Sequence, residues 1–181
     1  MEIKAKLIKP YTEEERMDFI VKNNHKMGYK IKETEETLEA WGKSENEILE
    51  EIRVEKKQEA IKKAYDFINN GNALYEFEEN KHIEATDGNI SKLGLVAVEL
   101  VLNQDTESTI EWCTYEDEII NLNAVQLQKI VKGLKDEQAR VWVELYHKFL
   151  QDIEIAQTIE EVNMIEINYE KLQKKVRSKK I

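Results

Sequence analysis

The sequence predicts an α+β protein: a small N-terminal β-α-β module, a long bridging helix, and a helix-rich C-terminal module with one or two β-hairpins. Three observations support this fold class. One proline and six glycines among 181 residues leave few obligatory helix breaks. Helix-capping pairs precede long stretches of helical periodicity. Short runs of alternating apolar and polar residues, typical of half-buried strands, separate those stretches.

Residues 1–42 make up the predicted N-terminal module. Apolar and charged residues alternate over 2–9, which predicts a strand. Thr12 stands three residues before a glutamate, the spacing of a capping box, and Gly28 is placed to end the helix that begins there. The alternation returns over 29–33 and predicts a second short strand, able to pair with the first.

Residues 43–72 predict one long bridging helix. Ser44 begins it with a second capping box, and Gly71 is placed to end it. Its apolar residues gather at the two ends, while the segment 53–59 (RVEKKQE) is nearly all polar. A helix of this kind usually connects two packing partners through solvent, so we place a domain boundary within 53–59.

Residues 73–157 make up the predicted C-terminal module, which opens with strand signals. Tyr75 and Phe77 alternate with glutamates, and the segment 82–85 can form the returning strand of a hairpin. A second hairpin is predicted from Ile110 and Trp112, across the loop TYEDE, to a strand that returns before Asn123.

Two long helices are predicted in the same module. The helix over 88–103 carries apolar residues on nearly all sides, which predicts that it is buried almost all round. Asn123 caps the next helix, whose apolar stripe keeps a 3.6-residue period from Leu127 to Ile153. Gly133 is the one candidate for a kink in it.

Residues 158–181 predict a C-terminal helix and a basic tail. Thr158 and Glu161 have capping spacing, and the helix is expected to run through Ile165 and as far as Leu172. The last twelve residues hold six basic side chains and one glutamate, a local charge of +5. We interpret the tail as a solvated, favourably charged helix end.

Composition and charge exclude several classes of protein. The formal net charge of −10 repels phosphate backbones and disfavours nucleic-acid binding. The longest apolar run, 93–102, is too short for a membrane span and contains a glutamate, and the first residues lack the apolar core of a signal peptide. Cys113 is the single cysteine, so no internal disulfide is expected, and we interpret it as a small buried hydrophobe.

No residue is predicted to be catalytic, to bind a cofactor or to hold a metal. His25, His82 and His147 lie far apart among polar neighbours, which indicates surface positions. No glycine-rich phosphate loop is present. Acidic clusters, including Glu116 and Asp117, are expected to be solvated, although a carboxylate hydrolase that uses those two residues is an alternative.

Aromatic residues are the candidates for a protein interface. Trp112 and Trp142 fall at strand and helix positions typical of a core, whereas Trp41 stands beside a glycine in a predicted connector. Trp41 is therefore the best interface candidate, and Tyr29 and Tyr115 are the other two.

Part of the chain resembles a known family. Between Ile83 and Ile153 it reads IEATDGNISKL, STIEW, IINLNAVQLQKIVKGL and FLQDI. This run resembles the C-terminal domain of unknown function found on bacteriophage tail-fibre, baseplate and tail-accessory proteins. The matched positions of its tryptophan-ended strand, polar turn, strand and N-capped helix are Trp112, Leu122, Gln126, Leu127, Ile130 and Ile153. The start, KLIKPYTEEERMDFIVKNNHKMGYKIKET, is similar to small uncharacterised proteins from phages of Gram-positive bacteria.

The resemblance implies a non-enzymatic structural component of the virion tail, a baseplate or tail-fibre connector assembled in the host bacterial cytoplasm. Its partners would be other phage tail, baseplate or fibre proteins. From charge and motifs, no nucleic-acid, membrane, metal or cofactor partner is expected. Homo-oligomerisation is left open. One alternative is a tail-fibre assembly chaperone absent from the mature virion, and another is a wall-degrading hydrolase.

Overall fold

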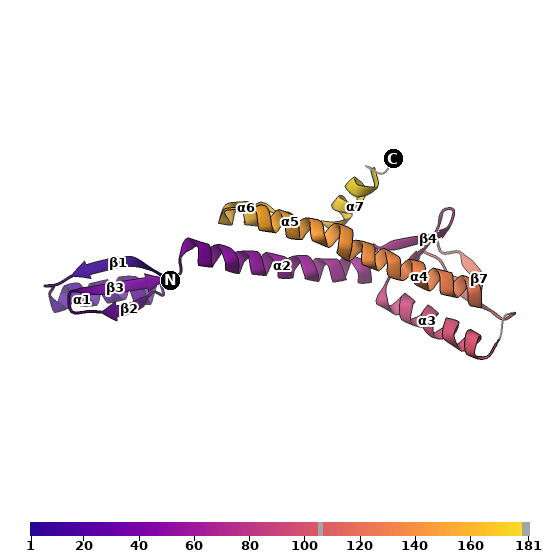
Figure 1. Cartoon of the computed structure of the whole chain (residues 1–181), viewed down its shortest axis with the longest axis horizontal. Coiled ribbons are helices and arrows are strands. Elements are labelled where there is room, and N and C mark those ends of the chain that lie inside the picture. Colours follow the sequence, from indigo (N-terminus) through magenta and orange to yellow (C-terminus); the bar gives the residue numbers. More distant parts are fainter. Residues whose placement is uncertain (105–106, 179–181) are drawn as a thin grey trace. The chain divides into compact units, whose positions relative to one another are not determined.

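The computed structural model describes residues 1–104 and 107–178 and confirms the α+β fold class (Figure 1). Contacts within the chain define two compact units. The first is Met1–Val54 with Thr158–Glu160, and the second is Glu55–Gln157 with Glu161–Ile181. The division after Val54 lies within the polar segment 53–59.

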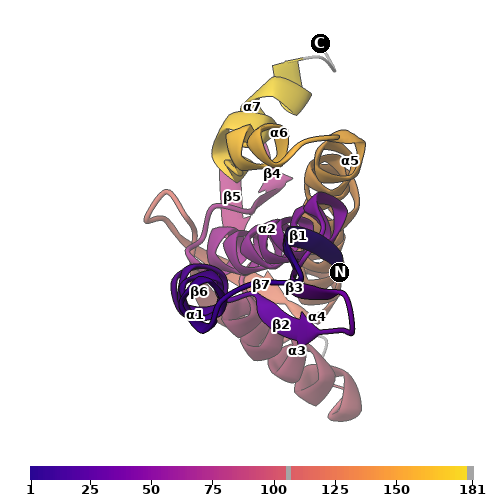
Figure 2. The same cartoon turned by 90° about the vertical axis from the view of Figure 1, so that its left-hand side faces the viewer.

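The first unit contains a three-stranded antiparallel sheet. Its elements in chain order are β1 (Glu2–Ile8), α1 (Glu13–Ile20), the π-helical turn η1 (Val21–Lys26), β2 (Lys30–Glu33) and β3 (Thr37–Gly42). The helical segment lies beside one face of the sheet (Figure 2). The Thr12 capping box is confirmed, and Gly28 follows the helix with a left-handed φ of 72°.

The predicted pairing of the first two strands is wrong. The strand order is β1-β3-β2, so β3 separates them and pairs with both. A tight turn explains this arrangement, because the N–H of Thr34 donates to the carbonyl of Thr37 at 2.7 Å and joins β2 directly to β3. The strand β3 thus occupies a place where a connector was expected.

The long helix predicted within 43–72 is confirmed as α2 (Glu45–Asn69). Ser44 and Glu47 form the predicted capping box, with N–H to side-chain oxygen distances of 2.8 and 3.3 Å. Gly71 follows the helix with φ 77°. Residues 50–59 include none that is buried, which agrees with the polar character of that stretch.

The second unit holds the two predicted hairpins, both confirmed as antiparallel pairs. The first is β4 (Leu74–Glu78) with β5 (Lys81–Glu84), and the second is β6 (Thr109–Cys113) with β7 (Ile119–Asn123). Between the hairpins lies α3 (Asp87–Leu102), which Thr86 caps by accepting the N–H of Asn89 at 3.1 Å.

A continuous helical path follows the second hairpin. It comprises α4 (Ala124–Arg140), the π-helical turn η2 (Val141–Tyr146) and α5 (His147–Ile155), and Asn123 caps it through a box with Gln126. The prediction of a kink at Gly133 is wrong, because the departure from α-helical geometry lies at η2. Gly133 instead makes room for a neighbour, since a Cβ there would overlap the ring of Tyr75.

The single predicted C-terminal helix is wrong in one respect, because two helices are present. They are α6 (Ile159–Met164) and α7 (Tyr169–Ser178), with an irregular segment between them. Of the basic tail, Lys179 and Lys180 lie outside the described residues.

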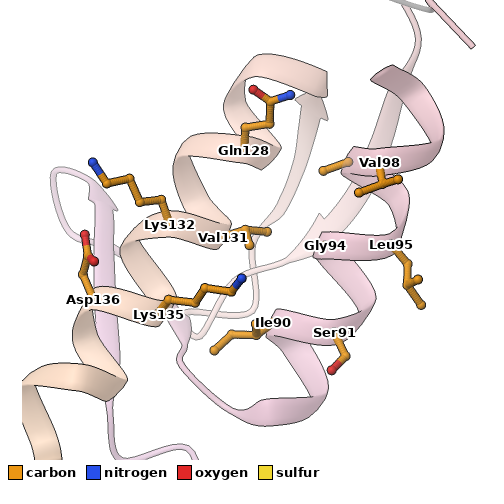
Figure 3. Close-up of a pocket in the computed structure, with 11 residues that line it drawn as sticks. Ile90, Ser91, Gly94, Leu95, Val98, Gln128, Val131, Lys132, Lys135 and Asp136 are labelled. Atoms are coloured by element: carbon orange, nitrogen blue, oxygen red, sulfur yellow. The ribbon is translucent and has the colours of Figure 1, made fainter. Parts of the chain in front are cut away.

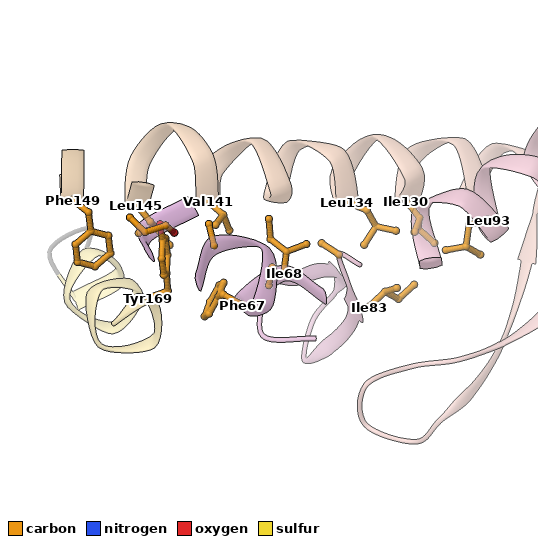
Figure 4. Close-up of a cluster of buried hydrophobic side chains, with 14 of the residues drawn as sticks. Phe67, Ile68, Ile83, Leu93, Ile130, Leu134, Val141, Leu145, Phe149 and Tyr169 are labelled. Atoms are coloured by element: carbon orange, nitrogen blue, oxygen red, sulfur yellow. The ribbon is translucent and has the colours of Figure 1, made fainter. Parts of the chain in front are cut away.

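Side chains from α2, β5, α3, the α4–η2–α5 path and α7 build the core of the second unit (Figure 4). Tyr169 packs α7 against this core. The centroid of the Tyr169 ring lies 5.0 Å from that of Phe149 and 5.8 Å from that of Phe67. Its hydroxyl donates to the carbonyl of Ala60 at 3.0 Å, and burial raises the pKa of Tyr169. Trp112 and Trp142 are half-buried at the edge of this core rather than inside it.

Two glycines within helices should respond in opposite directions to alanine. Gly133→Ala must displace the Tyr75 ring and should lower the free energy of unfolding by about 1–3 kcal/mol. Gly94→Ala in α3 is the matched control, because nothing lies within 4 Å of its added Cβ; it should raise that free energy by about 0.5–1 kcal/mol. Urea unfolding followed by circular dichroism measures both, and a stabilised Gly133→Ala would contradict the packing described.

Tyr169→Phe should lower the free energy of unfolding by about 1 kcal/mol, because it removes a buried hydrogen bond between α7 and α2. Tyr115→Phe, at a tyrosine that is 55% exposed, should change it by less than about 0.5 kcal/mol. The same urea titration compares them, and equal stabilities would show that the Tyr169 hydroxyl does not hold α7.

Candidate functional site

The structure brings two of the three interface candidates together. Trp41 lies in β3, opposite Lys30 of β2 and Ile3 of β1, so its predicted place in a connector is wrong. It is half-buried, and its indole N–H donates to Glu39 at 3.0 Å. Tyr29 precedes β2, and its ring lies so close to Gly42 that a Cβ there would overlap it.

Tyr29 and Trp41 line one pocket of about 560 Å³ within the first unit. The other lining residues are Met1, Lys4, Met27, Gly28, Lys30, Gly42, Lys43, Glu47 and Ile48. Two of its lysines are neutralised by neighbours, since Lys4 pairs with Glu2 and Lys43 pairs with Glu51. Aromatic walls with basic residues around them suit the binding of an apolar or aromatic side chain.

Tyr115 belongs to the second unit, so the structure does not group it with the other two candidates. It lies in the turn between β6 and β7, and its backbone N–H donates to the carbonyl of His82 at 2.9 Å. The ring is exposed, but its backbone serves to join two hairpins.

Glu116 reinforces the same junction. Its carboxylate accepts the backbone N–H of His82 at 3.0 Å and lies 2.7 Å from Nδ1 of that histidine. These hydrogen bonds, the backbone one first, hold the pKa of Glu116 below its usual value. A general acid in a hydrolase needs a raised pKa, so the geometry supports a structural use of this carboxylate.

In the part of the chain that the structure describes, no group of three or more His, Cys, Asp or Glu residues is arranged to hold a metal ion. The interpretation of Cys113 as buried is wrong, because its side chain is exposed on β6. Within the described residues, no helix has the length and apolar character that a membrane crossing requires.

Four exposed apolar side chains lie on α3, where the sequence predicted burial almost all round. That prediction is wrong. Only Leu93 and Ala97 of this helix are buried. Its exposed large apolar residues are Leu95 (73%), Val98 (57%), Val101 (48%) and Leu102 (76%). The chain itself covers one face of α3 and leaves the other open.

An open groove runs between α3 and α4, with a volume of about 910 Å³ (Figure 3). It is lined from α3 by Ile90, Ser91, Gly94, Leu95, Ala97 and Val98, and from α4 by Gln128, Val131, Lys132, Lys135 and Asp136. Gln138 of α4 fixes the start of α3, because its amide donates to the carbonyl of Ala85 at 2.8 Å and to Asp87 at 2.9 Å. The groove therefore has a defined geometry.

The sequence did carry a signal for this surface, namely apolar residues on both faces of one helix. It was interpreted as burial within the chain, because apolarity alone does not say which molecule covers the second face.

No protein-family model, curated protein or solved structure matches this chain.

Proposed function

We propose that this chain is a non-enzymatic binding protein that acts through protein contacts, and that the exposed face of α3 is its main contact surface. The observation that carries the proposal is the row formed by Leu95, Val98 and Leu102, which follows helical spacing along one side of α3. Full burial of one such side chain contributes about 1.5–3 kcal/mol, so a partner that covers several of them gains a substantial binding free energy.

The proposed setting is a bacteriophage tail, where the chain would serve as a baseplate or tail-fibre connector. This part rests on the sequence resemblance, which runs from Ile83 to Ile153 and so includes α3, α4 and the second hairpin. The separate Tyr29–Trp41 pocket supports a connector, because it gives the first unit a candidate contact surface of its own.

The test uses the phage that encodes the chain, with its own copy deleted and replaced by a plasmid copy. We expect wild-type protein in purified particles at a fixed copy number, measured by quantitative mass spectrometry. The variant Leu95→Glu with Val98→Glu should reduce that copy number at least about tenfold, because it places charges on the proposed contact surface.

A matched control is Val125→Glu with Val143→Glu, which changes two valines that are 74% and 64% exposed on the α4–η2 path. It should leave the copy number unchanged. Particles that never contain the wild-type protein would refute the structural role and favour the assembly chaperone. Normal incorporation of the α3 variant would refute the role of α3.

A further inference from the structure

We propose that the groove between α3 and α4 binds an amphipathic helix of a partner protein, and that the flank of this helix beside α4 is acidic. The inference rests on the proposed function and specifies the chemistry of its partner. It follows from the floor of the groove, from the wall that α3 supplies, and from the charges on α4.

The floor of the groove is apolar and open to side-chain insertion. Ile90 of α3 and Val131 of α4 point toward the space between the two helices (Figure 3). Gly94 stands on the α3 wall, and nothing lies within 4 Å of the position that a Cβ would take there, so a partner backbone can approach closely. Such a floor suits the apolar anchors of a helix laid in a groove.

The part of α3 that lines the groove is uncharged. Its lining residues are Ile90, Ser91, Gly94, Leu95, Ala97 and Val98. From Ile90 to Val98 they cover about 12 Å of helix at 1.5 Å per residue, and the exposed side chains of Val101 and Leu102 follow on the same helix. Contacts along this wall must be apolar packing, which a helix makes through residues spaced three and four apart.

The α4 wall supplies the charge. Lys132 and Lys135 are exposed, and among the described residues no carboxylate lies within ion-pair distance of either ammonium group. Asp136 is the one acidic side chain that lines the groove, so the lining carries a net charge of +1 in a chain of net charge −10.

Charge complementarity therefore selects an acidic partner over a second copy of the chain. A two-fold dimer through this groove would bring Lys132 and Lys135 of both copies to one interface, where like charges repel. An amphipathic helix with glutamates on one flank would pair with both lysines while its apolar face covers Val98 and Val131.

The test measures binding of two synthetic helical peptides to the full chain by fluorescence anisotropy. Both peptides share one leucine and isoleucine face, and their flanks carry either glutamate or lysine. We expect the glutamate peptide to bind at least about tenfold more tightly, and added salt to reduce the difference. Lys132→Glu with Lys135→Glu should reverse the preference. The control Lys22→Glu with Lys26→Glu, on exposed lysines of η1, should leave it unchanged.

The outcomes separate this inference from the proposed function. If both peptides bind with equal affinity and Val98→Glu abolishes the binding of both, the proposal of an acidic partner is overturned. That result would still support α3 as a contact surface. Binding of neither peptide would overturn the helix-binding groove, whereas the particle experiment tests the proposed function independently. A concentration-dependent dimer that Val98→Glu abolishes in sedimentation would assign the groove to a second copy. Stronger binding to vesicles of anionic phospholipid than to the glutamate peptide would assign it to a membrane surface.

Discussion

The second unit depends on a single apolar stripe along the α4–η2–α5 path. Leu127, Ile130, Leu134, Val141 and Leu145 are all nearly inaccessible to solvent on that stripe. The end of α2, the first hairpin and α7 contribute the side chains that cover it. The same row of side chains on the α4–η2–α5 path therefore positions each element that packs against it. The groove beside α3 is formed by α4 of this path, so its position depends on the same row.

Local signals in the sequence were sufficient for most elements. Capping boxes at Thr12, Ser44 and Asn123 each mark a helix start. In each box the two residues that hydrogen-bond to each other are only three positions apart, so the signal can be read from the local sequence. Both hairpins were also predictable, since alternation and a polar turn are properties of adjacent residues. These features depend little on the rest of the fold.

Features that depend on distant residues were not predictable in the same way. The central place of β3 is decided by its pairing with two strands, and a short segment that contains Ala40 and Gly42 has weak strand preference by itself. The sequence predicted a helix kink at Gly133, and only the position of the Tyr75 ring shows that this glycine makes room for a packed side chain. Of the candidate site, the sequence named Tyr29 and Trp41, which line one pocket, whereas it predicted that the open face of α3 is buried.

The hydrogen bond from Tyr169 to Ala60 has a consequence for how the protein is made. It joins residues 109 positions apart, so it cannot form until nearly all of the second unit has been synthesised. Until then Phe67 and the small-residue face of α2 lack the aromatic ring that covers them. A nascent chain paused before α7 would carry that uncovered surface on the ribosome, where it is open to chaperones and to association with other unfinished chains.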